Sequence, residues 1–263
     1  MRKKLYIGTN TKMYKTIAQT ASFLRELGEG VSDLDRELLE LFVIPSFTAL
    51  DAAAKVAAPY GIRLGGQNMA WEDEGQFTGE ISPVMLREVG VDIAEIGHSE
   101  RRHVLRETDE MENRKVKAAL RHDITALLCV GETERQKNHG VADEVLRIQL
   151  KEGLYGVDAR QAGNIWIAYE PVWAIGTGGQ PASADYAERR HCMIARTLEE
   201  LFGSSAQQIP VLYGGSVNLK NAQEIVVRTH IDGLFIGRSA WQADQFAEII
   251  HCVLPLFQAK EAL

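Results

Sequence analysis

The sequence has little cysteine, no strongly basic segment and no long apolar run. Its three cysteines, Cys129, Cys192 and Cys252, are far apart and show no metal-ligand spacing. We therefore expect reduced, mostly buried thiols and neither disulfides nor a metal site. The chain carries 36 acidic and 29 basic residues, a formal net charge of −7. Without a basic cluster, nucleic acid and an anionic membrane surface are poor candidates as partners.

No apolar run approaches the roughly 20 residues that a membrane-spanning helix requires. The segment 1–4 leads directly into a short strand-like run and not into the apolar core of a secretory signal. We therefore expect a cytoplasmic protein. The 263 residues show no linker, low-complexity segment or sharp change of composition, so we expect one domain over residues 1–263.

Short apolar runs alternate with amphipathic helical patterns along the whole chain. The runs typical of buried strands are 5–8, 41–44, 63–66, 93–96, 125–130, 165–168, 210–213 and 233–236. The helical patterns are 16–27, 48–58, 111–121, 142–150, 184–202, 219–227 and 245–256. Such alternation favours parallel strands with right-handed crossovers, and eight units in this length favour an α/β fold closed into a single (β/α)8 barrel. The strand–helix pattern is weak in the third unit, because residues 71–79 resemble a protruding loop.

Polar residues follow several of these strands. In a closed α/β barrel the C-terminal strand ends share one mouth, where the chemistry of such barrels takes place. The residues expected at this mouth are Asn10, Lys12, His98, Glu170, Ser216 and Gly237. A carboxylate facing an imidazole and an ammonium group suits proton abstraction beside a carbonyl.

The residues from Ser99 onward can open a helical turn directly after His98. The other six histidines are interpreted as surface or packing residues.

Glu170 is the acid on which this hypothesis depends. An apolar strand leads up to it, and Pro171 ends regular structure directly after it. The segment 172–179 combines apolar side chains with three glycines, a composition that suits a closable lid. From these residues alone, a half-buried turn with a solvated glutamate remains an equal alternative.

A phosphate group could be bound by backbone amides. The segment 214–216 and Gly237 can bring N–H groups close to an anion, and a short helix N-terminus would add a favourable dipole. Arg238, directly after Gly237, would add a cationic contact. We therefore expect a small phosphorylated substrate.

Seven segments, taken in order, resemble the triosephosphate isomerase family. They are Gly8–Met13, Gly66–Asn68, Gln76–Ser82, Ile96–Arg102, Cys129–Glu132, Ala168–Gly178, and the pair Tyr213–Val217 with Asp232–Gly237. The resemblance covers essentially the whole chain. It implies a TIM barrel and an aldose–ketose isomerase that interconverts glyceraldehyde 3-phosphate and dihydroxyacetone phosphate without a metal ion or organic cofactor.

The resemblance also assigns roles to the residues at the mouth. Glu170 would transfer a proton between two substrate carbons, and His98 would polarise the two substrate oxygens or move protons between them. Lys12 would stabilise the enediolate, and Asn10 would hold the oxygens. Glu100 is interpreted as a structural partner of Lys12 or Arg101 and not as a second base.

Further contacts are implied for the phosphate and for a second subunit. The amides of Gly176, Gly215 and Ser216, together with Gly237, would bind the phosphate. The loop around Thr78 would project into a neighbouring subunit beside Asn10 and Lys12, so the resemblance implies a homodimer.

The sequence departs from the family pattern near the phosphate site and the lid. Thr11 and Tyr14 replace a Trp and an Asn, Arg238 and Trp241 stand where a second glycine and small residues are usual, and residues 179–182 replace the usual end of the lid. These changes resemble a divergent branch that isomerises four-carbon ketose phosphates such as erythrulose phosphate, which is the main alternative for the substrate.

Two other functions remain as alternatives. An aldolase or lyase would be expected to have a lysine inside the barrel that forms a Schiff base, and strands two to eight contain no lysine. A silent sugar-phosphate-binding barrel would be expected to have lost Glu170, His98 or Lys12, and all three are present.

Overall fold

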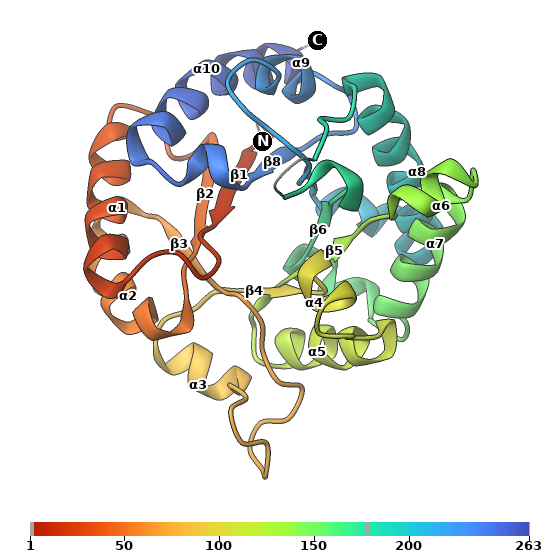
Figure 1. The fold of residues 1–263 in the computed structure, drawn as a ribbon, viewed down its shortest axis with the longest axis horizontal. Helices are drawn as coiled ribbons and strands as arrows, with labels where there is room; N and C mark the ends of the chain where they lie inside the picture. The colour runs from red at the N-terminus through yellow and green to blue at the C-terminus, as the bar shows by residue number, and fades with distance from the viewer. Residues whose placement is uncertain (1–2, 177–178, 263) are drawn as a thin grey trace.

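The structure, a computed structural model, describes residues 3–176 and 179–262. Within these ranges, parallel strands β1 to β8 pair in sequential order and close into a barrel, with helices around its outside (Figure 1). Pairing of Tyr6 in β1 with Gly233 in β8 closes the ring. The prediction of a (β/α)8 TIM barrel is confirmed.

Every apolar run expected to be a strand overlaps one. The strands are β1 (Leu5–Asn10), β2 (Leu39–Ile44), β3 (Arg63–Gly66), β4 (Ile93–Ile96), β5 (Thr125–Val130), β6 (Ile165–Tyr169), β7 (Val211–Tyr213) and β8 (Gly233–Ile236). The strand before Glu170 ends at Tyr169, so that acid follows it directly, as predicted.

The helices are less completely predicted than the strands. They are α1 (Ile17–Gly30), α2 (Leu50–Ala57), α3 (Pro83–Glu88), α4 (Ser99–His103), α5 (Asp109–Arg121), α6 (Glu134–Asn138), α7 (Ala142–Gly153), α8 (Ala184–Phe202), α9 (Ala222–Val226) and α10 (Ala243–Glu261). Helices α3 and α6 fall outside the expected patterns, because six and five residues are too few to show a 3.6-residue period. None of the helices in the described ranges is long and apolar enough to cross a membrane.

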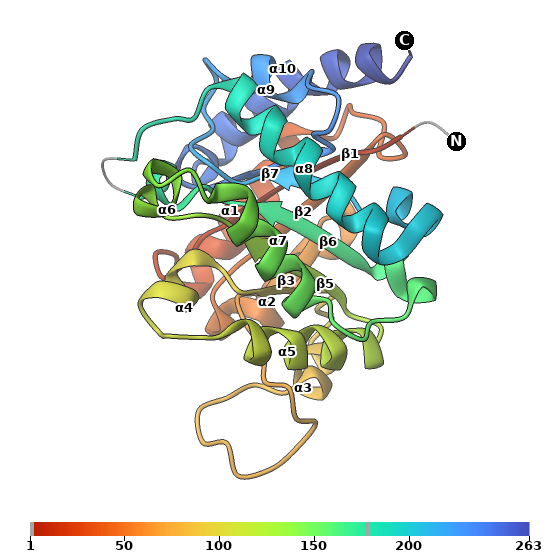
Figure 2. The ribbon, with the colours of Figure 1, turned by 90° about the vertical axis from the view of Figure 1, so that its right-hand side faces the viewer.

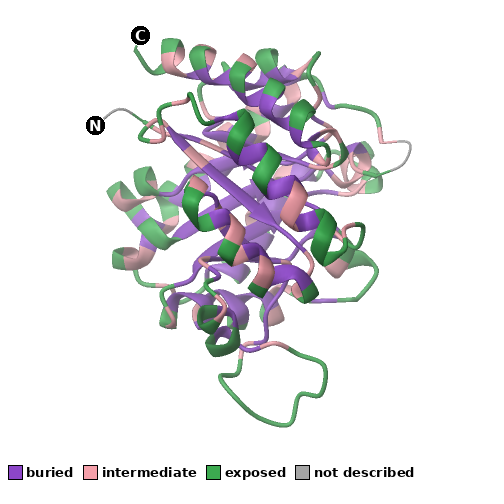
Figure 3. Ribbon diagram, turned by 90° about the vertical axis from the view of Figure 1, so that its left-hand side faces the viewer, coloured by how far each residue is buried: buried purple, intermediate pink, exposed green. Residues whose placement is uncertain are grey.

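Residues alternate between two cores along each strand, because successive side chains of a strand point to opposite faces. In β5, Leu127 and Cys129 point into the barrel, whereas Leu128 and Val130 face the surrounding helices. The buried strands and inner helix faces form a continuous interior, with exposed residues on the outer faces of the helices (Figure 3). The barrel interior is filled by Phe42, Ile44, Ile93, Leu127, Cys129, Trp166, Ala168, Leu212 and Phe235.

The connection from β3 to α3 projects from the barrel (Figure 2). It contains residues 71–79, which the sequence predicts to form a protruding loop. Residues 72–80 are exposed. The ring of Phe77 packs edge-on against half-buried Trp71, with 6.3 Å between centroids. The protruding loop predicted from the sequence is confirmed.

His191 lies on α8 and packs behind β6 and β7. Its ring is fully buried and contacts the rings of Tyr169 and Tyr213, with centroids 5.6 and 6.1 Å away. Its Nδ1 lies 3.2 Å from the carbonyl oxygen of His230. Burial lowers the pKa of His191 from 6.5 to about 3. His191 is therefore a packing residue that stays neutral in the folded protein.

This neutrality predicts an acid-dependent loss of stability. Because the unfolded chain binds a proton at this residue between pH 6.5 and 3 and the folded protein does not, stability falls as the pH falls through that range. Between pH 7 and pH 5 the loss from this residue is about 2 kcal/mol. His191→Asn keeps an N–H donor but does not titrate, so its stability should fall by about 2 kcal/mol less over this interval.

Urea unfolding of both proteins at pH 7 and pH 5 measures the difference. The exposed His139 supplies the control, since His139→Asn should keep the wild-type pH dependence. If His191→Asn also keeps the full wild-type dependence, the buried ring does not carry the effect.

Candidate active site

A cavity of about 310 Å³ opens at the C-terminal ends of the strands. The expected site residues that line it are Asn10, Lys12, His98, Glu170, Gly176, Gly215, Ser216, Gly237 and Arg238. Thr78 does not line it in the described part of the chain, since it lies in the exposed loop between β3 and α3. A larger open hollow at the other end of the barrel borders Lys3, Tyr6 and Pro210 and contains none of the expected residues.

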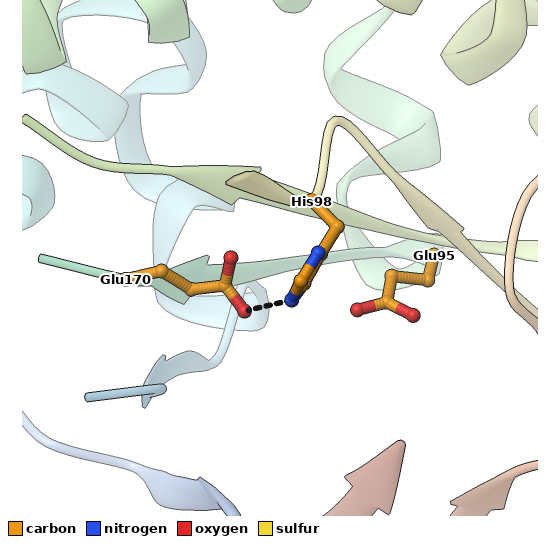
Figure 4. A group of neighbouring side chains, drawn as sticks. All are labelled: Glu95, His98 and Glu170. Atoms are coloured by element: carbon orange, nitrogen blue, oxygen red, sulfur yellow. Dashed lines mark ion pairs between the residues drawn. The ribbon is translucent and has the colours of Figure 1, made fainter. Parts of the chain in front are cut away.

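Glu170 follows β6 and points into this mouth. Its N–H donates to the carbonyl oxygen of Val130, and its side chain is almost fully buried. One carboxylate oxygen accepts a hydrogen bond from the Ser99 N–H at 3.3 Å, and the other lies 3.6 Å from Nε2 of His98 (Figure 4). The alternative of a solvated glutamate in a half-buried turn is therefore wrong.

Two glycines leave space for Glu170. A Cβ atom on Gly131 would lie 1.9 Å from the carbonyl oxygen of Glu170, closer than any real contact. A Cβ atom on Gly214 would lie 2.9 Å from Cγ of the same residue. The glycines after β5 and β7 thus allow the backbone on either side to approach the acid.

His98 caps the short helix α4. Its Nδ1 accepts a hydrogen bond from the N–H of Glu100 at 3.2 Å. Since Nδ1 is the acceptor, the proton of a neutral imidazole lies on Nε2, the nitrogen that faces Glu170. The imidazole therefore presents an N–H donor to the cavity. The helical turn expected directly after His98 is confirmed.

Glu95, His98 and Glu170 could also be considered as metal ligands, because one donor atom from each lies within 4.8 Å of the others. However, the proton on Nε2 of His98 occupies the lone pair that a metal ion would need. We therefore interpret the three residues as a hydrogen-bonded acid–base group. The absence of a metal and a cofactor in the active protein stays a prediction.

The loop after β1 holds Lys12 in an unusual conformation. Its φ is 50°, in the left-handed region that residues other than glycine rarely adopt. The N–H of Lys12 donates to Oδ1 of Asn10 at 2.6 Å, and Nε2 of Gln67 donates to Oδ1 of Asn10 at 3.0 Å and to the carbonyl oxygen of Lys12 at 2.8 Å. These bonds fix the loop and keep both expected side chains at the cavity.

Glu100 pairs with Lys12, with Nζ and Oε1 2.6 Å apart. Partial burial raises the pKa of Glu100, but the hydrogen bond from Lys12 and the charges of His98 and Lys12 outweigh it, so the net pKa is lowered. The expected structural role for Glu100 as a partner of Lys12 agrees with this contact.

Buried Glu132 anchors the segment after Glu170. Its Oε1 accepts hydrogen bonds from Nε1 of Trp173 and from the hydroxyl of Tyr186, both at 2.8 Å, and its Oε2 accepts from the hydroxyl of Tyr169 at 3.1 Å. The start of the expected lid is therefore fixed to β5 and β6. Residues 177–178, near the end of that lid, lie outside the described residues.

Residues that depart from the family pattern meet at the cavity wall. The rings of Tyr14 and Trp241 pack with centroids 4.5 Å apart, and Nε1 of Trp241 donates to the carbonyl oxygen of Asn10 at 2.9 Å. Trp241 and exposed Arg238 both line the cavity. Trp241, against which Tyr14 packs, and Arg238 therefore form part of the cavity wall.

Glu95 was not predicted as a site residue, and Gln67 was noted only as part of the segment Gly66–Asn68, without a role. Glu95 lies in β4 and accepts a 2.6 Å hydrogen bond from Nδ2 of Asn10, while Gln67 holds the other end of the same amide. A charged residue inside the short apolar run 93–96 was a usable signal for Glu95. The contacts of Gln67 have no local signal, since its partners are 57 and 55 positions away in the chain.

The fold and the site define an isomerase of the TIM-barrel class, and comparison with known proteins agrees. The family model described as triosephosphate isomerase matches residues 5–253. The chain therefore belongs to the triosephosphate isomerase family, and the resemblance found in the sequence is confirmed.

Individual members of the family can be compared with the chain directly. The chain is 48% identical to an L-erythrulose-1-phosphate isomerase of Rhizobium etli, over 94% of this chain and 91% of the relative. It is 44% identical to a protein of the same name from Rhizobium meliloti, over 95% and 96% of the two chains. The crystal structure of triosephosphate isomerase from Bartonella henselae superposes with a TM-score of 0.85 at 36% identity, over 95% and 98% of the two chains.

The contact at Gly131 predicts a loss of activity. A methyl group at this position would displace the backbone of Glu170, so Gly131→Ala should lower kcat by about tenfold or more. The Michaelis constant should change less, because Gly215, Ser216 and Gly237, which are expected to bind phosphate, follow β7 and β8 and not β5.

Steady-state kinetics of the isomerase test this, with Gly163→Ala as the control. A Cβ atom on Gly163 would approach only the flexible end of Gln208, at 3.3 Å, so kcat should remain near wild type. Normal turnover by a folded Gly131→Ala enzyme would show that the position of Glu170 tolerates displacement.

Proposed function

We propose that the chain isomerises L-erythrulose 1-phosphate by proton transfer through an enediolate. The observation that carries the reaction type is the buried carboxylate of Glu170 beside the Nε2 atom of His98. Support for the substrate comes from relatives at 42–48% identity that are named L-erythrulose-1-phosphate isomerase.

The chemistry follows from the substrate's functional groups. A four-carbon 2-ketose 1-phosphate has its ketone at C2 and a hydroxyl-bearing carbon at C3. Glu170 takes the proton from C3, which gives an enediolate across C2 and C3. The same carboxyl group returns a proton to C2, while His98 moves a proton between the two oxygens. The ketone then stands at C3, and no atom is gained or lost.

Other cavity residues stabilise charge and hold the substrate. The ammonium group of Lys12 and the amide of Asn10 face the region where the enediolate oxygens develop charge. The backbone at Gly215, Ser216 and Gly237 borders the same cavity and can bind the phosphate. Each such donor contributes about 3 kcal/mol to the stabilisation of charge in a water-excluded site.

The first expectation from the family, interconversion of glyceraldehyde 3-phosphate and dihydroxyacetone phosphate, is less well supported than this alternative. Arg238 and Trp241 line the pocket and depart from the family pattern, which favours a changed substrate. The four-carbon substrate has one hydroxymethyl group more than the triose phosphate. We therefore favour a role in tetritol breakdown over glycolysis or gluconeogenesis. A silent binding barrel is unsupported, since the chain belongs to an isomerase family.

The substrate proposal predicts a preference that can be measured directly. One preparation should show kcat/KM at least about 100-fold higher on L-erythrulose 1-phosphate than on glyceraldehyde 3-phosphate, because a site shaped for a hydroxyl group discriminates against a substrate that lacks it. Arg238→Gly should change this ratio by about tenfold. A preference for the triose phosphate, or a ratio unaffected by the substitution, would contradict the proposal.

We also propose a homodimer through the loop around Thr78. The loop projects into solvent, and Phe77 exposes 43% of its surface there. Near the cavity, Met13 and Tyr14 expose 94% and 68% of theirs. Two exposed apolar regions of this kind, one on a loop and one beside the site, suit mutual burial by a second copy.

Sedimentation equilibrium should therefore give twice the chain mass of 29.2 kDa. Thr78→Arg places a charge in the proposed interface and should shift the protein toward monomer with reduced kcat. Tyr155→Arg changes an aromatic residue outside this loop that is 74% exposed, and it should leave the dimer intact. A monomeric wild-type protein would rule out the homodimer.

A further inference from the structure

Glu95 is a fully buried acid that the reaction described above does not use. It lies in β4 two residues after Ile93, so its side chain shares the inward face of the strand. In Figure 4 the ring of His98 lies between the carboxyl groups of Glu95 and Glu170. Glu95 thus occupies the barrel interior next to the acid–base pair.

The contacts of Glu95 fix the amide of Asn10. Oε2 of Glu95 accepts a hydrogen bond from Nδ2 of Asn10 at 2.6 Å. On the other side of the amide, Oδ1 accepts from the N–H of Lys12 and from Nε2 of Gln67. With three bonds made, the amide cannot flip, and one Nδ2 hydrogen remains for a substrate oxygen.

The groups that face Glu95 favour its neutral form. The thiol of Cys129 lies 4.0 Å from Oε1, and Glu170 approaches from β6. The nearby cation is Lys12, whose ammonium group already pairs with Glu100. Burial and the charge of Glu170 raise the pKa of Glu95 well above its ordinary value. Oε2 accepts the short hydrogen bond from Asn10 at 2.6 Å, whereas Oε1 accepts only the long 4.0 Å contact from the Cys129 thiol, so the proton belongs on Oε1.

Glu170 has the better partners for a charge. It accepts a hydrogen bond from the N–H of Ser99 and faces Nε2 of His98. Two carboxylates this close cannot both ionise without strong repulsion, so the proton resides on the group with weaker support. That group is Glu95.

We propose that Glu95 is a positioning residue: as a neutral acid it orients the Asn10 amide toward the substrate oxygens and leaves Glu170 as the ionised base. This role rests on the proposed isomerase function. It acts through Asn10 and requires no contact between Glu95 and substrate.

Two substitutions separate this role from packing and from acid–base catalysis. Glu95→Gln keeps an uncharged group with an oxygen acceptor for Asn10 and should retain kcat within about threefold of wild type. Glu95→Leu removes the acceptor and should lower kcat by about 10- to 100-fold, because a donor at the reacting oxygens loses its orientation. Full activity of Glu95→Leu, or equal damage by both substitutions, would overturn the proposal.

A double-mutant cycle and a pH profile test the mechanism of the effect. If Glu95 acts through Asn10, Asn10→Ala combined with Glu95→Leu should turn over no more slowly than Asn10→Ala alone. In a plot of kcat/KM against pH, the decrease on the acid side (the acid limb) should occur at the same pH in wild type and Glu95→Gln. An ionised Glu95 would raise the pKa of the base, so a limb shifted to lower pH in Glu95→Gln would contradict a neutral Glu95.

A measurement without substrate distinguishes failure of this proposal from failure of the proposed function. Infrared difference spectra of wild type minus Glu95→Gln at pH 7.5 should contain the carbonyl band of a protonated carboxyl group. Carboxylate bands in its place would overturn the proposal even in an active isomerase. The protonated band in a protein that isomerises neither substrate would refute the function and leave the neutral acid standing.

Discussion

The site depends on keeping one ionised carboxylate, Glu170, in a place almost without water. The residue is 3% exposed, and a second carboxyl group, on Glu95, belongs to the same cluster. At 4.8 Å, the upper limit of the separations in this cluster, two negative charges repel by about 3.5 kcal/mol at an effective dielectric constant of 20. The surrounding structure must therefore supply donors to one carboxyl group and let the other keep its proton.

In the barrel, residues that follow different strands lie together around Glu170 and meet this requirement. The amide of Ser99 and the ring of His98 come from the connection after β4, and Gly131 after β5 lets the backbone of Glu170 approach. Lys12 comes from the loop after β1 and is held in a left-handed conformation by its neighbours. Elements distant in sequence thus place each charge, and the apolar interior below them excludes water.

Much of this arrangement could be predicted from the sequence, because strands and strand-end residues leave local signals. The apolar run before Glu170 and the proline after it place that acid at the end of a strand without any tertiary information, but they do not predict its burial. The role of Glu95 could not be predicted in the same way, since its partner Asn10 is 85 positions away and its inward orientation depends on strand register. The contact between Tyr14 and Trp241 likewise joins distant segments. Helices α3 and α6 were missed because they are too short for periodicity.

Proton transfer by Glu170 is the central claim, and isomerisation in deuterated water tests it most directly. Turnover of L-erythrulose 1-phosphate should place solvent deuterium on the carbon that receives the proton, because the carboxyl group exchanges with solvent during the lifetime of the enediolate. Glu170→Gln should abolish this labelling together with turnover. Turnover and labelling that survive at the wild-type level in Glu170→Gln would contradict the mechanism.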